Sequence, residues 1–492
     1  MNDHDLEVRL SGFYRAEVDG ATTAPLTLRM AVADIPVQAT RSGRTGRRPV
    51  LLLAAAMTVV GVGGTLALGA ALVRAPERSP DPSTHFGITA PTPGASLIAG
   101  PTSGPVASPL VPTDGPEFEP GFRSIGNLAT PRFQHTATLL LDGRVLIAGG
   151  TSSRGEHLAS TEFWDPSTEA FTAGPPLGLG RFGHTATRLD DGRVLIVGGV
   201  VAGDPNEIGT REIELWDPAT GLFRAAGLTT DPHTGGLTTV RLADSRVMII
   251  GGLDCRPATE PARLDTRPPC RGAQPAAEIW DPVTESVTPT GSPAEDHDWA
   301  AATLLADGRV FLLGGGKLPT IGSEVWDPAT GGWSPGGAPA QPRLGSQSMT
   351  LLPDGRVLVV GGNTGSLNGD PFPPPLRSAE IWDPATESFS PTGPLEVGRE
   401  RHRAILLADG RVLILGGVGK RAADFTDTSI AEAEIWDSAT GSFSSAGRGA
   451  AGRALQTATL LPDGRVLITG GFTRVERGEV AADTATAEIW AP

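Results

Sequence analysis

Two short apolar stretches separated by an Asp-Gly-Arg turn recur along the C-terminal part of the chain. In the first copy they are residues 136–141 and 145–148, and a Gly-Gly pair ends the second stretch. Asp-Gly between two β-prone segments favours a hairpin. The second stretch is apolar at every position instead of alternating, which is typical of a strand covered on both faces. The pattern therefore predicts hairpins inside a stack of sheets.

The pattern occurs seven times with a fixed internal spacing. In every copy the first Gly of the pair lies seven residues after the Asp, and a Glu-x-Trp triplet follows. The Asp residues are Asp142, Asp191, Asp244, Asp307, Asp354, Asp409 and Asp463, and the Trp residues are Trp164, Trp216, Trp280, Trp326, Trp382, Trp436 and Trp490. The first six tryptophans are each followed, seven residues on, by a hydrophobic residue: Phe171, Phe223, Val287, Trp333, Phe389 and Phe443. A repeat of about fifty residues has room for four strands, so each copy predicts one propeller blade with antiparallel strands a to d.

The apolar run ending in Gly-Gly, the aromatic residue before Asp-Pro and the second aromatic residue resemble the kelch repeat. Trp takes the place of the family's more usual Tyr in the third strand. The match covers residues 118–492. The resemblance implies an all-β fold, a seven-bladed kelch-like β-propeller, over these residues. It does not imply one function, because the family includes binding modules, sugar-processing enzymes and copper oxidases.

The last repeat has no strand d after Trp490, since the sequence given stops at Pro492. Phe122 lies 10 residues before Arg132, as Phe171 lies before Arg181. We therefore expect residues near 118–124 to supply strand d of the final blade and to pair with the strand around residues 487–490. This pairing would leave no open sheet edge.

Three segments precede the repeats. Residues 1–48 form a polar leader, and residues 74–117 are rich in Pro, Ser, Thr, Gly and Ala, as expected of a semi-rigid linker. Between them, residues 50–73 carry no charge, and this run exceeds the roughly 20 residues that cross a bilayer. We predict a transmembrane helix over residues 49–73. A cleaved signal peptide is the alternative, although its n-region and apolar core would be unusually long.

The charges that flank the apolar run predict its orientation. Four arginines precede it and two follow it: Arg41, Arg44, Arg47 and Arg48, then Arg74 and Arg78. The positive-inside rule places residues 1–48 in the cytoplasm. We expect a single-pass protein of the cell membrane with its N-terminus inside and its propeller on the extracytoplasmic side.

The composition and net charge of the chain bear on which kinds of molecule it can bind. The formal net charge is −15, and 65 Gly and 44 Pro make the chain too turn-rich for a helical protein. An acidic chain lacks the basic face that would replace phosphate counterions, so we expect no nucleic acid partner.

The two cysteines, Cys255 and Cys270, lie in the longest interruption of the repeats. In an oxidising exterior we expect them to form a disulfide. Two free thiols are the alternative. A zinc site is disfavoured, because two thiols without a nearby His cannot complete a zinc shell.

The candidate binding face is the one that carries the b–c loops and the d–a connections. Nearly all variation in repeat length lies in the b–c loops, and variable loops on a rigid scaffold commonly bind ligands. The longest, residues 253–277, is locally basic, with Arg256, Arg263, Arg267 and Arg271. Such a loop suits an anionic polymer such as an acidic polysaccharide. A solvated loop without a ligand is the alternative.

An Arg-x-x-His motif should lie on the same face. Its copies are Arg132 and His135, Arg181 and His184, and Arg399 and His402. These side chains could grip a carboxylate or a sugar hydroxyl near the central channel. Alternatively, they brace one blade against the next, as kelch-like repeats often do. The Glu of each Glu-x-Trp should pair with a nearby Arg or backbone amide, because seven equivalent carboxylates cannot form one active site.

Enzyme hypotheses differ in the residues they need. A copper-radical oxidase needs tyrosine ligands, and a sialidase needs a tyrosine nucleophile. The one tyrosine of the chain is Tyr14, in the leader, so both activities are excluded. A sugar epimerase or mutarotase needs only Glu, His and Arg, so it remains an alternative. A transmembrane sensor signalling through residues 1–48 is another. We favour a membrane-anchored extracytoplasmic binding protein without a cofactor or metal, whose ligand is a carbohydrate or a protein.

Overall fold

The computed structural model describes residues 120–201, 209–233, 235–252, 277–294, 297, 299–315, 322–364, 374–420, 427–474 and 480–492. The chain separates into Met1–Val106 and a second compact unit, Ala107–Pro492. The leader, the predicted transmembrane helix and the linker lie outside the described residues. Among the residues that are described, no helix is long and apolar enough to cross a membrane.

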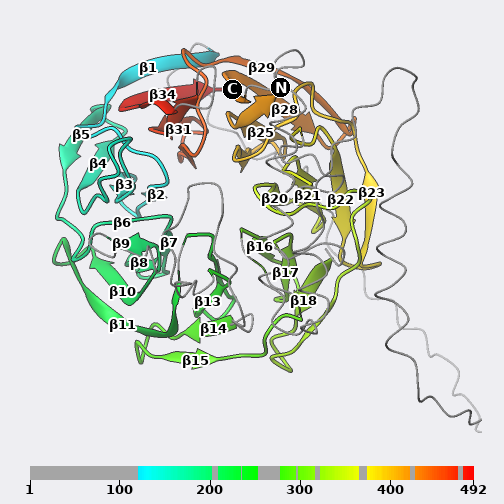
Figure 1. Cartoon of the computed structure of the whole chain (residues 1–492), viewed down its shortest axis with the longest axis horizontal. Coiled ribbons are helices and arrows are strands. Elements are labelled where there is room, and N and C mark those ends of the chain that lie inside the picture. Colours follow the sequence, from blue (N-terminus) through cyan, green and yellow to red (C-terminus); the bar gives the residue numbers. More distant parts are fainter. Residues whose placement is uncertain are drawn as a thin grey trace, which may run out of the picture. The chain divides into compact units, whose positions relative to one another are not determined.

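Seven four-stranded antiparallel sheets form a ring in the second unit (Figure 1). The prediction of an all-β, seven-bladed propeller is confirmed. Strands a to d are β2 (Thr136–Leu139), β3 (Val145–Ala148), β4 (Thr161–Asp165) and β5 (Ala170–Ala173) in blade 1; β7 (Thr185–Arg188), β8 (Val194–Val197), β10 (Thr210–Asp217) and β11 (Leu222–His233) in blade 2; and β12 (Thr238–Arg241), β13 (Val247–Ile250), β14 (Ala277–Trp280) and β15 (Val287–Pro289) in blade 3.

The next three blades repeat this order. Strands a to d are β16 (Ala301–Leu304), β17 (Val310–Leu313), β18 (Ser323–Trp326) and β19 (Trp333–Pro335) in blade 4; β20 (Ser348–Leu351), β21 (Val357–Val360), β22 (Ala379–Asp383) and β23 (Ser388–Pro391) in blade 5; and β24 (Arg403–Leu406), β25 (Val412–Leu415), β28 (Glu432–Asp437) and β29 (Ser442–Arg448) in blade 6.

The core lies between blades. Every residue of each strand b is buried, as the continuous apolar runs predict. Trp280 of blade 3 packs with Leu195 and Ile213 of blade 2, and its indole N–H donates to the carbonyl of Ala226 at 2.9 Å. Trp382 and Trp490 make the same bond to the preceding blade, at 2.8 and 3.0 Å. Each tryptophan of the seven Glu-x-Trp triplets packs against the blade before its own.

The b–c loops and the d–a connections lie on one face, as predicted. The d–a connection of a blade pairs with the residue that follows the Gly-Gly of the same blade. These contacts are Phe133 with Thr151, Gly345 with Asn363, Glu400 with Val418 and Ala454 with Phe472, together with β6 (Arg181–Phe182) and β9 (Val200–Val201). Two b–c loops also contain short hairpins, β26 (Val418–Lys420) with β27 (Asp427–Ser429) and β32 (Phe472–Arg474) with β33 (Val480–Asp483).

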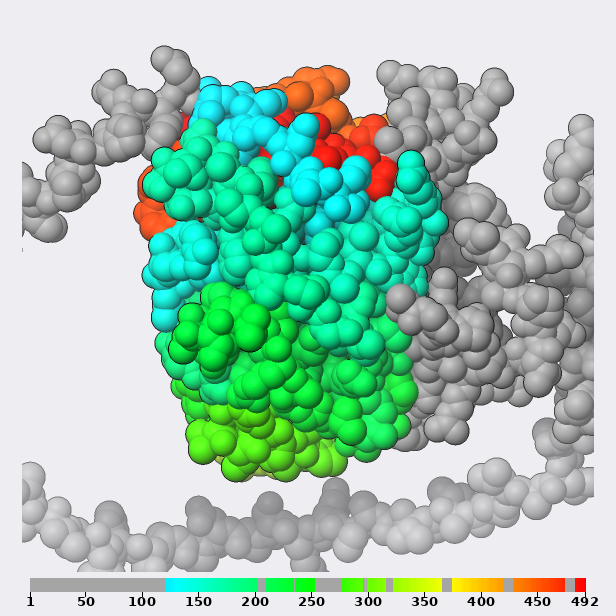
Figure 2. Space-filling view, turned by 90° about the vertical axis from the view of Figure 1, so that its left-hand side faces the viewer, coloured from blue at the N-terminus to red at the C-terminus, as the bar shows by residue number. Residues whose placement is uncertain are grey.

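The ring closes through the first described strand. Blade 7 consists of β30 (Thr457–Leu460), β31 (Val466–Thr469), β34 (Thr486–Ala491) and β1 (Gly121–Asn127). Phe122 lies opposite Trp490, which confirms the predicted closure, and the strand continues beyond residue 124 to Asn127. In the space-filling view the cyan residues of the N-terminal strand lie against the red C-terminal strand, and blades 1–3 form a closely packed side wall (Figure 2).

The Gly-Gly pairs lie where adjacent blades come closest. The N–H of Gly471 in blade 7 donates to the carbonyl of Arg132 in blade 1 at 2.9 Å. Gly470 has φ 59°, and a Cβ at this position would lie 2.5 Å from the same carbonyl oxygen and 2.7 Å from Cε1 of His135. Because no other residue type has both the conformational freedom and the small size, glycine is required at this seam.

We predict that Gly470→Ala lowers the free energy of unfolding by at least about 2 kcal/mol more than Gly464→Ala does, because only the first places a methyl group into the seam. Gly464 is a matched control in the same blade, since its φ is 87° and a Cβ there would have nothing within 4 Å. Both variants carry the left-handed strain penalty. Urea unfolding of both variants measures the difference, and equal losses would show that the seam tolerates the extra methyl group.

Candidate functional site

The seven Glu-x-Trp carboxylates are paired, as expected. The five Arg–Glu pairs have N–O distances of 2.5–2.9 Å, and His replaces Arg in blades 3 and 4. The pairs are Arg132–Glu162, Arg181–Glu214, His233–Glu278, His297–Glu324, Arg343–Glu380, Arg399–Glu434 and Arg453–Glu488. The second oxygen of a carboxylate can cap backbone amides, as Glu162 does for the N–H of Ala129 at 2.9 Å. These carboxylates are therefore satisfied within the scaffold.

The arginines of the three Arg-x-x-His motifs lie inside the blades. Arg132, Arg181 and Arg399 are all 0% exposed. Besides its Glu, Arg132 donates through Nη1 to the carbonyls of Gly149 and Ser160, each at 2.9 Å. These bonds tie the d–a connection to strands b and c of the same blade. The arginines therefore serve the scaffold, and these bonds hold the parts of one blade together instead of bracing one blade against the next.

The histidines of the motif lie between blades. Nε2 of His184 is 3.1 Å from Oγ1 of Thr136 in the preceding blade, and Nε2 of His402 is 2.8 Å from Oγ of Ser348. Burial, together with the charges of nearby arginines, lowers the pKa of both imidazoles to about 3. Burial likewise lowers the pKa of His135, which bonds Thr457 and Thr469 of blade 7. All three imidazoles are therefore neutral at neutral pH.

The residues predicted in the long loop of blade 3 lie outside the described residues. They are Cys255, Arg256, Arg263, Arg267, Cys270 and Arg271. The disulfide and the basic binding loop remain predictions from the sequence.

A ring of seven left-handed residues lies at the inner end of the d–a connections. Each lies one residue before the His of the Arg-x-x-His motif, or one residue before the equivalent position in a blade without that His. The residues and their φ values are Gln134 (53°), Gly183 (67°), Gly236 (103°), Trp299 (61°), Ser346 (60°), Arg401 (55°) and Leu455 (52°). Five of these are not glycine, although non-glycine residues adopt this conformation only rarely. We call this set the mouth ring.

Backbone hydrogen bonds hold the mouth ring together from blade to blade. In each, the N–H of one member donates to the carbonyl of the member in the preceding blade. The bonds run from Gln134 to Leu455 (3.3 Å), Gly183 to Gln134 (3.0 Å), Trp299 to Gly236 (3.1 Å), Arg401 to Ser346 (3.0 Å) and Leu455 to Arg401 (3.4 Å). Residues whose strained backbone is held in place by the surrounding structure are concentrated at ligand sites.

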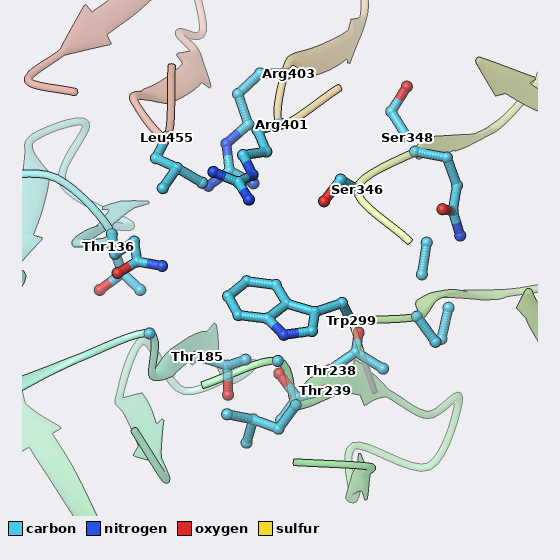
Figure 3. Close-up of a pocket in the computed structure, with 18 of the residues that line it drawn as sticks. Thr136, Thr185, Thr238, Thr239, Trp299, Ser346, Ser348, Arg401, Arg403 and Leu455 are labelled. Carbon is cyan, nitrogen blue, oxygen red and sulfur yellow. The ribbon is translucent and has the colours of Figure 1, made fainter. Parts of the chain in front are cut away.

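The mouth ring surrounds a cavity of about 490 Å³ at the centre of the propeller. This volume is in the range of about 300–1,000 Å³ typical of small-molecule sites. The half-buried indole of Trp299 extends into its middle, facing Arg401, Arg403 and Leu455 from the opposite blades (Figure 3). Six residues add hydroxyl groups to a lining that otherwise includes alanines, Leu237 and Met349: Thr136, Thr185, Thr238, Thr239, Ser346 and Ser348. The cavity can therefore offer one aromatic face, two guanidinium groups and many hydroxyls to a ligand.

Sequence reasoning did not find Trp299, Arg401 or Arg403. The Glu-x-Trp triplets contain seven of the nine tryptophans, and Trp333 occupies the second aromatic position of its repeat, so Trp299 is the one left over. A tryptophan outside the repeat pattern was therefore the sequence feature that could have pointed to the cavity. The mouth ring itself has no sequence signature, because its seven positions are filled by six residue types.

No protein-family model and no curated protein matches the chain in sequence. A solved structure described as a novel fungal alcohol oxidase with catalytic diversity among the AA5 family, in complex with copper, is similar in fold. The TM-score is 0.57 at 16% sequence identity, over 75% of each chain. At this identity the similarity concerns the β-propeller fold alone.

The residues present do not fit the copper of that oxidase. The part of the chain that the structure describes contains no group of three or more His, Cys, Asp or Glu side chains able to hold a metal ion. The three motif histidines lie at separate blade seams, and each is bonded to a hydroxyl. The sole tyrosine, Tyr14, lies far outside the repeats in sequence.

We predict that His402→Gln folds and flattens the pH dependence of stability between about pH 4.5 and 6.5. The folded pKa of His402 is about 3, below its unfolded value, so the unfolded chain binds an extra proton in this window and stability rises with pH. Removing one such group should reduce the slope of the free energy of unfolding against pH by up to about 1.4 kcal/mol per pH unit.

Two other blades provide the structural precedent for this variant. Gln347 and Gln456 occupy the equivalent position and donate to the carbonyls of Leu313 and Leu415 at 2.7 and 2.9 Å. Urea unfolding of the wild type and of His402→Gln across this pH window measures the two slopes. Identical slopes would mean that His402 is protonated in the folded protein.

Proposed function

We propose that this chain is a membrane-anchored, extracytoplasmic kelch-repeat binding protein whose propeller captures a carbohydrate at the mouth ring. The observation that carries the proposal is the position of Trp299, whose indole extends into the central cavity among hydroxyl-bearing side chains (Figure 3). The membrane anchor and the exterior location rest on the sequence of residues 49–73 and its flanking arginines.

The lining suits a sugar because a sugar is amphipathic. Its C–H face packs on an apolar aromatic surface, and its hydroxyls both donate and accept hydrogen bonds. Trp299 provides the surface, and Gln134, Ser346 and Thr238 provide polar groups around it. The ring of Trp299 also lies beside Gly235 of the neighbouring blade.

The state of the histidines supports binding over sugar epimerisation or mutarotation. A general base works best with a pKa near the working pH. His184 and His402 have pKa values of about 3, and their Nε2 atoms are engaged by Thr136 and Ser348. Their arrangement is that of structural groups.

We predict that the full chain, purified in a mild detergent, binds oligosaccharides on a glycan array and that Trp299→Ala weakens this binding at least about tenfold. The loss follows from removing the central aromatic contact, since truncation of such a residue is typically worth 2 kcal/mol or more. Binding to no oligosaccharide, or unchanged binding by Trp299→Ala, would contradict the proposal.

Trp333 offers a matched control in the same blade. It lies on strand d at the outer edge, where its indole N–H donates to the carbonyl of Gly291 at 2.6 Å, and most other blades have Phe at this position. The ligand-induced change in tryptophan fluorescence should disappear in Trp299→Phe and persist in Trp333→Phe. The opposite result would place the ligand on the rim.

A further inference from the structure

We propose that the sugar bound at the mouth ring carries a carboxylate, as a hexuronic acid does, and that Arg401 and Arg403 hold this group. The inference rests on the proposed function and adds the chemical class of its ligand.

The first observation is the pairing of the arginines. Most arginines of the described blades form ion pairs with Asp or Glu at N–O distances of 2.9 Å or less. The two at the cavity differ. Arg403 bonds only a backbone carbonyl among the described residues, that of Gln456, at 2.8 Å through Nε. The nearest described carboxylate to Arg401 is Glu400, 3.8 Å from its Nε, and Glu400 also accepts from Asn363 at 2.5 Å.

The second observation is the charge of the cavity. None of the described residues that line it is Asp or Glu, although the chain as a whole has a net charge of −15. The lining histidines are neutral, so Arg401 and Arg403 are the charged groups of the described lining. The described cavity is therefore positive within an acidic protein.

The third observation is the geometry of the two guanidinium groups. Arg401 belongs to the mouth ring and Arg403 begins β24, while His402 between them points into the seam towards Ser348. Both arginine side chains project from blade 6 towards the indole of Trp299 (Figure 3). The bond from Nε of Arg403 to Gln456 leaves its Nη groups to donate to a ligand. A planar guanidinium binds a carboxylate through two parallel hydrogen bonds, which fixes orientation as well as charge.

These features together favour an acidic sugar over an acidic peptide. A carboxylate at the arginines would place the remainder of a sugar ring over the cavity, where Trp299 offers a flat apolar face and Ser346 and Thr238 offer hydroxyls. Each part of a uronic acid then has a partner of matching chemistry.

The test compares two trisaccharides by calorimetry with the full chain: trigalacturonic acid and its neutral counterpart, a galactose trisaccharide of the same linkage. We expect the acidic sugar to bind at least about tenfold more tightly at 50 mM salt and this preference to shrink at 300 mM salt, because exposed charges are screened. Arg403→Gln and Arg401→Gln should each remove most of the preference, because each variant takes one guanidinium away from the carboxylate.

Arg448→Gln is the matched control. Arg448 lies on β29 of the same blade, away from the cavity, and its exposed side chain pairs with Glu432. This variant loses the same charge and should keep the full preference for the acidic sugar. If Arg448→Gln and Arg403→Gln reduce the preference equally, the effect is one of net charge and the inference fails.

The outcomes separate the inference from the proposed function. If the two sugars bind equally and Trp299→Ala binds neither, the inference of a carboxylate is overturned and the carbohydrate-binding function is supported. If neither sugar binds and a hexaglutamate peptide does, both proposals fall. Tighter binding of trigalacturonic acid, dependent on Arg401 and Arg403 but not on Arg448, supports both.

Discussion

The close approach of each Gly-Gly pair to the next blade is the constraint on which the other features depend. At the seam between blades 7 and 1, Gly471 bonds the carbonyl of Arg132 while Gly470 leaves room for the ring of His135. The position of this backbone fixes the d–a connection, and the connection carries the mouth ring. Side chains as different as Trp299, Arg401 and Ser346 therefore extend into one cavity because the same seam recurs around the propeller.

The buried ion pairs allow this arrangement and also restrict where binding can occur. A buried arginine without a partner would be strongly destabilising, so each buried Arg of the d–a connections needs the Glu of the Glu-x-Trp triplet in its own blade. The pairing removes Arg132, Arg181 and Arg399 from solvent. Charge that can meet a ligand is then left to an arginine such as Arg403, which lies outside the repeat pattern and, among the described residues, bonds only a backbone carbonyl.

The sequence predicted the fold well because the fold is set by local, repeated signals. The apolar four-residue strands, the turns and the spacing of the tryptophans predict seven blades, and Phe122 predicts the closing strand that pairs with Trp490. The site was harder to predict. The motif arginines stand out in the sequence because they are repeated, and they are repeated because they serve the scaffold. Trp299 and Arg403 occur once each, and their proximity depends on ring closure between blades 4 and 6, which no local pattern encodes.

The central claim is that the ligand binds at the mouth ring. Hydrogen–deuterium exchange of the full chain, with and without a bound acidic trisaccharide, tests it most directly, because slowed exchange identifies the backbone that the ligand stabilises. We predict slower exchange in peptides that contain Trp299 and in those that span residues 399–404, with no change in the outer strands β15, β19 and β23. Protection confined to those outer strands would contradict the account.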